Sequence, residues 1–140
     1  MNKINSFSGD YDFLSNFYNC PVTYDGITYT NSEATYQAQK CADKADRLQF
    51  VGLHAGKSKR LGRRIALRPD WEDIKVTEML NIVRAKFSQN DDLKVKLLAT
   101  GDSYLEEGNT WGDTTWGTVN GQGANLLGKI LMQVRTELHP

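Results

Sequence analysis

The residues whose types and spacing suggest chemistry are Glu33, Gln37 and Lys40, which are four and then three positions apart. They lie in residues 30 to 41, a segment that favours a helix because it has two alanines, two glutamines and no glycine or proline. At about 3.6 residues per turn, these side chains fall along one side, with Tyr36 beside them. A carboxylate, an amide, an amine and an aromatic ring would then share a surface suited to lining a pocket.

The same spacing also fits a structural role. Thr30 and Glu33 match a capping box, in which Glu33 reaches back to the Thr30 amide. Lys40 in the last turn suits the negative end of the helix dipole. The spacing is compatible with either interpretation.

Residues 57 to 68 carry the strongest local charge. Six basic residues and no acidic residue fall in these twelve positions: Lys57, Lys59, Arg60, Arg63, Arg64 and Arg68. Arginine and lysine donors match phosphate oxygens, so the cluster is a candidate phosphate clamp, with a solvated helix face as the alternative.

Other polar and aromatic residues are candidates for pocket walls. Residues 7 to 18 form an irregular, aromatic-rich segment that is either pinned to the core by side chains such as Phe17 or presents Asn16 to a pocket. Trp71, at the start of a predicted helix, is either a packing plug or a platform for a flat ring.

A long loop over residues 108 to 123 holds five glycines and two tryptophans, Trp111 and Trp116, and such loops are often functional. Asp113 is the acid best placed to be held inside it. The last helix follows the loop, and free amides at its start, with Asn125 nearby, could hold an anion.

Composition limits the class of protein. The 140 residues include 17 basic and 17 acidic side chains, so no global charge draws the chain to nucleic acid or to an anionic membrane. No signal peptide and no apolar run of about 18 residues is present, and we expect a cytoplasmic protein with Cys20 and Cys41 as free thiols. The two histidines lack zinc-ligand spacing, so we expect no metal and no cofactor.

Local patterns predict one α+β domain over residues 1–140, predominantly helical, with a β-hairpin and short strands. Asp25-Gly26 between two β-rich runs predicts a type I′ hairpin over residues 22 to 29. Helices are expected at 30–41, 43–53, 70–87, 91–99 and 124–138. Two apolar stripes are predicted to face the core: Leu48, Phe50 and Val51 in the second helix, and Val76, Leu80, Val83 and Phe87 in the third.

Short motifs then recur in order along nearly the whole chain. They are FLSNF at 13–17, SE at 32–33 with QAQK at 37–40, LGR at 61–63, WE at 71–72 with Lys75, AKF at 85–87, LLATG at 97–101, Asp113 with WG at 116–117, and GxNxLG at 123–128 with LM at 131–132 and Arg135. In this combination the chain resembles the NADAR superfamily, and within it the YbiA-like N-glycosidase family. One departure is Ala34, where many relatives have histidine, so the identity of the substrate is left open.

The resemblance implies a hydrolase that cleaves the bond between C1 of a ribose and a nitrogen. In the YbiA-like branch the substrates are phosphoribosyl-amine intermediates of riboflavin synthesis, and similar enzymes remove ADP-ribose from the amino group of guanine in nucleic acid. Both are phosphorylated ribosyl compounds that carry a flat heterocycle.

Each part of such a substrate has candidate partners. We expect Lys57, Arg60 and Arg63 at the phosphate and Trp71 and Trp116 at the heterocycle, with Asn16, Phe17, Gln37 and Asn125 as further binding residues. Glu33 and Asp113 would fill the carboxyl roles, as in two-carboxylate glycosidases. Alternatively, Lys40 would attack C1 of the ring-opened sugar and form a Schiff base.

Two functions of another class remain open. The same tryptophans and arginines would serve a non-catalytic module that binds ADP-ribose or another NAD-derived nucleotide. A DNA-binding helical domain would depend on residues 57 to 68 alone, and zero net charge disfavours it.

Overall fold

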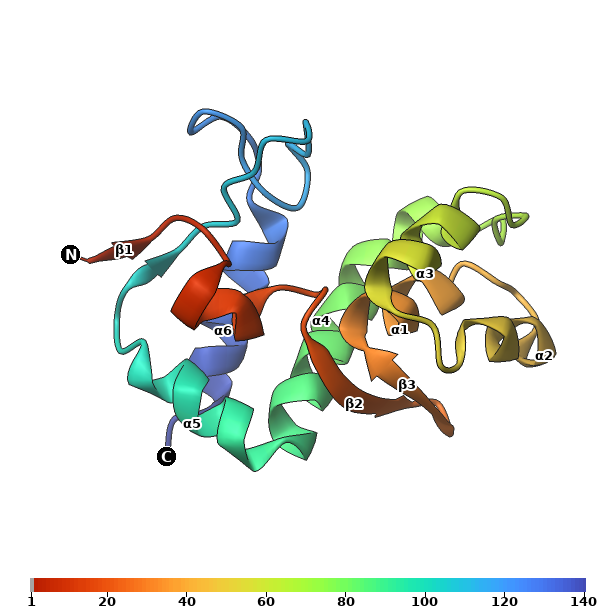
Figure 1. Cartoon of the computed structure of the whole chain (residues 1–140), viewed down its shortest axis with the longest axis horizontal. Helices are drawn as coiled ribbons and strands as arrows, with labels where there is room; N and C mark the ends of the chain where they lie inside the picture. The colour runs from red at the N-terminus through yellow and green to blue at the C-terminus, as the bar shows by residue number, and fades with distance from the viewer. Residues whose placement is uncertain (1) are drawn as a thin grey trace. The chain divides into compact units, whose positions relative to one another are not determined.

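A computed structural model describes residues 2–140 (Figure 1). The chain forms two compact units, one of residues 16–90 and one that joins the segment up to Ser15 with residues 91–140. Helices dominate both units, and each contains one two-stranded sheet. The predicted α+β, predominantly helical class is therefore confirmed, whereas a single domain over residues 1–140 stays a prediction.

A β-hairpin begins the unit of residues 16–90. Strand β2, Asn19–Tyr24, pairs antiparallel with strand β3, Ile27–Asn31. Asp25 and Gly26 both have positive φ angles, 50° and 80°, as a type I′ turn requires. The predicted hairpin is confirmed, and β3 leads directly into the first α-helix (Figure 1).

That helix, α1 (Ser32–Ala38), is buried along its whole length. It is shorter than the predicted segment of residues 30 to 41, because the amides of Gln39, Lys40 and Cys41 bond three residues back and tighten the chain into a turn. Its N-cap is Asn31, whose side chain accepts a hydrogen bond from the Ala34 amide at 2.7 Å. The expected capping box from Glu33 to Thr30 is replaced by this Asn31 cap.

Further helices in this unit are α2 (Lys44–Arg47), the 3₁₀ turn η2 (Leu48–Phe50), α3 (Ala55–Gly62) and α4 (Trp71–Gln89). The predicted apolar side of residues 43–53 is wrong in part, because Leu48 and Val51 are exposed and only Phe50 is buried. In α4 the expected stripe is wrong at Val76, which is exposed. The residues that α4 buries are Trp71, Met79, Ile82, Val83, Lys86 and Phe87.

The second unit brings together the two ends of the chain. Strand β1 (Lys3–Ile4) pairs in parallel with β4 (Tyr104–Leu105), and α6 (Leu126–Leu138) contacts both β4 and α5 (Asp91–Ala99). The 3₁₀ segment η1 (Gly9–Leu14) also belongs to this unit and buries Phe13 and Leu14. Within residues 2–140, no helix is long and apolar enough to cross a membrane.

The loop between β4 and α6 has more regular structure than predicted. A parallel bridge joins Gly108 and Thr118, and an antiparallel bridge joins Val119 and Gln122. Asn120 and Gly121 between the latter pair have φ angles of 53° and 78°, which makes a second type I′ turn. The Asn-Gly dipeptide was the sequence signal for this small hairpin, and the interpretation as a plain loop overlooked it.

Glu106 fixes this loop to β1, and the pH dependence of stability should show its contribution. Its buried carboxylate accepts a hydrogen bond from the Thr118 hydroxyl and lies 2.9 Å from the Lys3 ammonium. These two contacts, that of Thr118 first, hold the pKa of the Glu106 carboxyl below its usual range. The contribution of Glu106 to the free energy of unfolding is therefore complete above its unfolded pKa of about 4.3. It is lost as the pH falls through the lower pKa of Glu106 in the folded protein.

We expect Glu106→Gln to lower the free energy of unfolding at pH 7 and to flatten its decline in acid. Urea denaturation at pH 7 and pH 3 would measure both effects. Asp10→Asn, which changes an exposed carboxyl in the same unit, is the control and should change neither. Equal acid dependence in the Glu106 variant and the parent protein would contradict the prediction.

Candidate active site

The polar face of α1 is turned into the protein. Glu33 and Gln37 are only 8% and 6% exposed, and Gln37 Nε2 donates a hydrogen bond to Glu33 Oε2 at 2.6 Å. Burying a carboxylate is costly unless donors satisfy it, and this contact from the next helical turn meets part of that need. The structural alternative for Glu33, a capping residue on a solvated face, is therefore not what the chain adopts.

Asn16 holds the first turn of α1 in place. Its main-chain oxygen accepts a hydrogen bond from the Glu33 amide at 3.0 Å, and its side-chain oxygen accepts one from Ser32 Oγ at 2.9 Å. Its amide group donates to the sulfur of Met79 at 3.6 Å. Asn16 thus fixes the backbone at Glu33, and its predicted contact with substrate stays a prediction.

Lys40 follows the end of α1 and is half-buried. Burial lowers the pKa of its ammonium group, the charges of Arg63 and Lys75 lower it further, and those of Glu33 and Glu72 act in the opposite direction. The lowered pKa increases the fraction of neutral amine, the form that can attack an electrophilic carbon. Glu33 and Arg63 are thus among the charged residues that act on the Lys40 amine.

Helix α3 packs on α1 through small residues. Ser58 and Gly62, one helical turn apart, are both buried, and a methyl group built at Gly62 would lie 1.9 Å from Gln37 Oε1. A side chain at position 62 would thus occupy the space of the Gln37 amide. Sequence reasoning assigned no role to Gly62 and listed no helix at these residues, although small residues spaced four apart are a signal of close helix packing.

Replacing Gly62 by alanine should therefore destabilise the protein by about 1–3 kcal/mol, the range for inserting a group into a packed interior. Gln37 cannot withdraw without straining or breaking its hydrogen bond to Glu33. Urea denaturation would measure the loss, and turnover should fall with it once a substrate is established.

Gly56→Ala is the matched control, because it lies in the same helix and its new methyl group would meet no atom closer than 3.7 Å. Alanine favours a helix over glycine, so this variant should be neutral or slightly more stable. If the two variants had the same free energy of unfolding, the packing argument for Gly62 would be wrong.

The basic cluster extends along and beyond α3. Lys57, Arg60 and Arg63 are exposed, and within residues 2–140 none of them forms an ion pair with an acidic side chain. Arg68 differs, because its guanidinium contacts Asp70 at 2.7 Å. The predicted clamp residues are thus available to an anion, and Arg63 acts on the same amine as Glu33.

Two aromatic residues of this unit have different exposures. Trp71 is 4% exposed and packs against Tyr36, with ring centroids 5.2 Å apart. Phe17 is 49% exposed, and the ammonium of Lys59 lies 5.8 Å from its ring. The structure gives Trp71 the packing role that the sequence offered as one alternative, and its contact with a heterocycle stays a prediction, as does that of Phe17.

Ala34, the departure from the family pattern, directly follows Glu33 and lies about 100° from it around α1. It is fully buried in a cluster with Ile27, Tyr29, Ala38, Cys41 and Phe50. A side chain at this position contacts the hydrophobic core, whereas Glu33 and Gln37 contact each other. Alanine at this position thus packs in the core, and its effect on the choice of substrate stays open.

The remaining predicted residues belong to the other unit. Asp113 Oδ1 accepts hydrogen bonds from the amides of Thr115 and Trp116, at 3.0 and 2.9 Å, so Asp113 organises its own loop. Its side-chain carboxyl is the acid held inside the loop, as expected from the sequence. Catalysis by Asp113 and substrate contact by Trp116 stay predictions.

Two of the amides expected to be free at the start of α6 have partners in the preceding loop. Those of Leu126 and Leu127 donate to the carbonyls of Thr115 and Trp116. The side chain of Asn125 is also engaged, accepting from the Glu107 amide and donating to Leu105 and Tyr104. The amides of Leu126 and Leu127 thus bind loop carbonyls where an anion was expected. Substrate contact by Asn125 stays a prediction.

Comparisons with known proteins show the family to which the chain belongs. The model of the NADAR domain matches residues 5–139. The chain is 40% identical to N-glycosidase YbiA of Shigella sonnei, over 95% of this chain and 85% of that protein. It is 46% identical to a riboflavin biosynthesis protein of Vibrio vulnificus over 92% of this chain, although it spans only 36% of that relative. The NMR structure of the Escherichia coli protein YbiA is similar, with a TM-score of 0.85, 39% identity, and coverage of 98% of this chain and 84% of that chain.

Proposed function

Because the chain belongs to the NADAR domain family, we propose that it is an N-glycosidase that hydrolyses the bond between C1 of a phosphorylated ribose and the nitrogen of a heterocyclic amine. Relatives of comparable length that are named N-glycosidases support this activity. The observation that carries the proposal is the buried Glu33–Gln37 pair on α1, and the lowered pKa of the Lys40 amine supports it.

Glu33 suits one route to bond cleavage. Its carboxylate takes a proton from water as the water oxygen bonds to C1, the C1–N bond breaks, and the departing nitrogen takes up a proton from solvent water. The carboxylate also stabilises positive charge that develops on the sugar. Gln37 holds the carboxylate by its hydrogen bond, which fixes the geometry before substrate binds.

Lys40 suits a second route through a covalent intermediate. After the sugar ring opens, the neutral amine of Lys40 bonds to C1. The C1–N bond to the heterocycle then breaks, and the heterocyclic amine leaves with the proton that the Lys40 nitrogen loses. Water then hydrolyses the imine, which releases the sugar aldehyde and regenerates Lys40. The lowered pKa of Lys40 supports this route, and Glu33, whose charge acts on Lys40, would be the base for the proton transfers.

The exposed side chains of Lys57, Arg60 and Arg63 would bind the phosphate of the substrate. We propose a phosphoribosylamino-pyrimidine, the class of riboflavin intermediate, as the substrate, because one relative is named a riboflavin biosynthesis protein. ADP-ribose on a guanine base is the competing substrate, with the same C1–N bond and an additional phosphate.

Incubating the protein with both compounds side by side tests the proposal, with mass spectrometry to detect free heterocycle and free sugar phosphate. Release from the pyrimidine compound is the expected result. Release only from an ADP-ribosylated guanine oligonucleotide would keep the activity and change the substrate. Binding of ADP-ribose without release from either compound would instead establish a non-catalytic binding module.

A further inference from the structure

Lys75 on α4 is a charged residue beside the polar face of α1, and it takes no part in either route to bond cleavage. Trp71, Lys75 and Met79 follow one another at intervals of four residues, so they lie along one side of α4 on successive turns. The Trp71 ring centroid lies 5.2 Å from that of Tyr36 on α1, and the Met79 sulfur accepts a hydrogen bond at 3.6 Å from Asn16, which holds the first turn of α1. Lys75 therefore lies between two points at which α4 meets the α1 region.

Glu72 holds the side chain of Lys75. The Lys75 ammonium lies 2.9 Å from one carboxylate oxygen of Glu72 and 3.1 Å from the other. Only 27% of the Lys75 side chain is exposed, compared with 76% for Glu72, so the ammonium is the inner member of the pair. Helical side chains lean toward the N-terminus of their helix, which directs Lys75 toward the end of α4 that packs on Tyr36. Because Tyr36 is one helical turn before Lys40, Lys75 leans toward the part of α1 that leads to Lys40.

Charged groups from three helices act on the Lys40 amine. They are Glu33 on α1, Arg63 at the end of α3, and Lys75 with Glu72 on α4. Burial is the largest cause of the lowered pKa of Lys40, and the charge of Glu33 opposes it. Arg63 and Lys75 lower the pKa further, and the opposing effect of Glu72 is smaller than the effect of Lys75. The pair on α4 thus has a net positive influence on Lys40, as expected when its inner member is the cation.

We propose that Lys75 is a positioning residue of the candidate active site: held by Glu72 beside the polar face of α1, its positive charge keeps the Lys40 amine in the neutral form that attacks C1. This role rests on the imine route of the proposed N-glycosidase activity. A cation near a half-buried lysine disfavours a second positive charge, so the amine gives up its proton to water at a lower pH. Lys75 acts only through Lys40 and bonds to no reacting atom.

Substitutions of the two members of the pair should change Lys40 in opposite directions, and this separates a charge effect from a loss of packing. Lys75→Gln should raise the pKa of Lys40, because it removes a cation and leaves Glu72 uncompensated. Glu72→Gln should lower the pKa of Lys40, because it leaves Lys75 uncompensated. NMR of the full chain with ¹³C-labelled lysine, followed as the pH is raised, would measure this pKa without any substrate, and Lys40→Arg identifies the signal by its disappearance. Shifts of the same sign in both variants, or no shift in either, would overturn the proposal.

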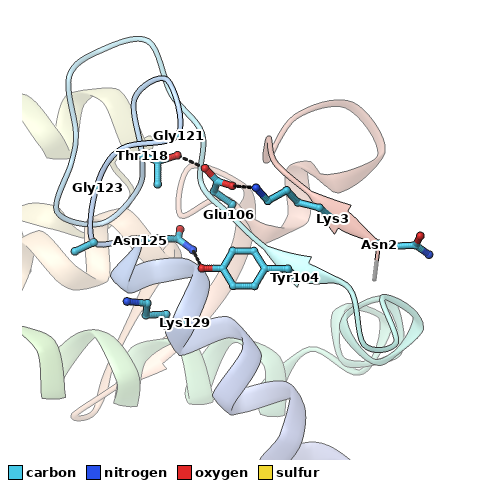
Figure 2. Close-up of a pocket in the computed structure, with 10 residues that line it drawn as sticks. Asn2, Lys3, Tyr104, Glu106, Thr118, Gly121, Gly123, Asn125 and Lys129 are labelled. Atoms are coloured by element: carbon cyan, nitrogen blue, oxygen red, sulfur yellow. Dashed lines mark hydrogen bonds and ion pairs between the residues drawn. The ribbon is translucent and has the colours of Figure 1, made fainter.

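Three further variants are the controls. Lys75→Arg keeps the charge and should leave the pKa of Lys40 as in the parent protein. Asp73→Asn removes an exposed carboxylate next to Glu72 in the sequence. Lys129→Gln removes an exposed ammonium in the other unit, where Lys129 lines a pocket of about 520 Å³ (Figure 2). Neither Asp73 nor Lys129 forms an ion pair within residues 2–140, so both variants should leave Lys40 unchanged. A shift in Lys129→Gln as large as that in Lys75→Gln would show an effect of net charge alone and reject the role of Lys75.

Turnover is the second measurement. At pH 7, Lys75→Gln should lower kcat by about tenfold, a size typical of one nearby charge, and raising the pH or substituting Lys75→Arg instead should restore it. Glu72→Gln should reach its half-maximal rate at a lower pH than the parent protein. A kcat of Lys75→Gln equal to that of the parent at every pH would overturn the role in catalysis, even if the pKa of Lys40 shifts. If the parent protein cleaves no N-glycoside, the proposed function fails, and the NMR shifts still decide whether Lys75 controls the Lys40 amine.

Discussion

Glu33→Gln is expected to lower kcat by about a hundredfold or more while the protein stays folded and nearly as stable as the parent. Glutamine has almost the shape of glutamate, and its oxygen can accept the hydrogen bond that Gln37 Nε2 now donates to the carboxylate. The helix cap is unaffected, because Asn31 supplies it. The change thus removes a negative charge and a base while keeping the packing of α1.

Turnover of the established substrate and the melting temperature, measured on the same preparation, would test this prediction. Asp73→Asn is the control, since Asp73 is exposed and forms no ion pair within residues 2–140. It should retain turnover within a few-fold. A Glu33→Gln enzyme with parental turnover and a lower melting temperature would show that Glu33 is structural.

Lys40→Arg is the second change with a large expected effect, a fall in kcat of about a hundredfold or more if the imine route operates. Arginine keeps the positive charge, but its guanidinium stays protonated and cannot act as the nucleophile. Borohydride added during turnover should trap the sugar phosphate on the parent protein, and peptide mass spectrometry should locate the adduct on Lys40.

Lys44→Arg is the control for Lys40, because it alters an exposed lysine on α2 and should preserve both turnover and trapping. The rate should also rise with pH through the pKa of Lys40, below the ordinary lysine value of about 10.4, because burial favours the neutral amine. Full activity in Lys40→Arg, with no trapped adduct on the parent, would exclude the imine route and leave direct attack by water.

Local sequence signals predicted the parts of the fold that depend on neighbours in the chain. Asp25-Gly26 placed the first hairpin because few residues other than glycine, asparagine and aspartate tolerate two consecutive positive φ angles. The same signal at Asn120-Gly121 was present and was overlooked among the loop glycines. The face formed by Glu33 and Gln37 also followed from helical spacing alone.

Tertiary contacts decided what the sequence left open. Helix α4 has apolar residues on more than one side, so periodicity favoured Val76 although packing buried Met79 and Ile82. Lys86 is 1% exposed, with its ammonium 5.1 Å from the Phe87 ring, whereas lysine is rarely buried so completely. The hydrogen bonds from the amides at the start of α6 could not be predicted from local sequence either, because their partner carbonyls come from residues ten or more positions earlier.

The complete burial of α1 joins folding and chemistry in one seven-residue helix. One side of it meets the hydrophobic core through Ala34 and Ala38, and the adjacent side holds Glu33 and Gln37. Random substitution within this helix would therefore endanger stability and turnover together, which leaves it little freedom to drift. Evolution toward new substrates has more latitude on α3, whose exposed cations can be exchanged one at a time, and a directed library is best placed there.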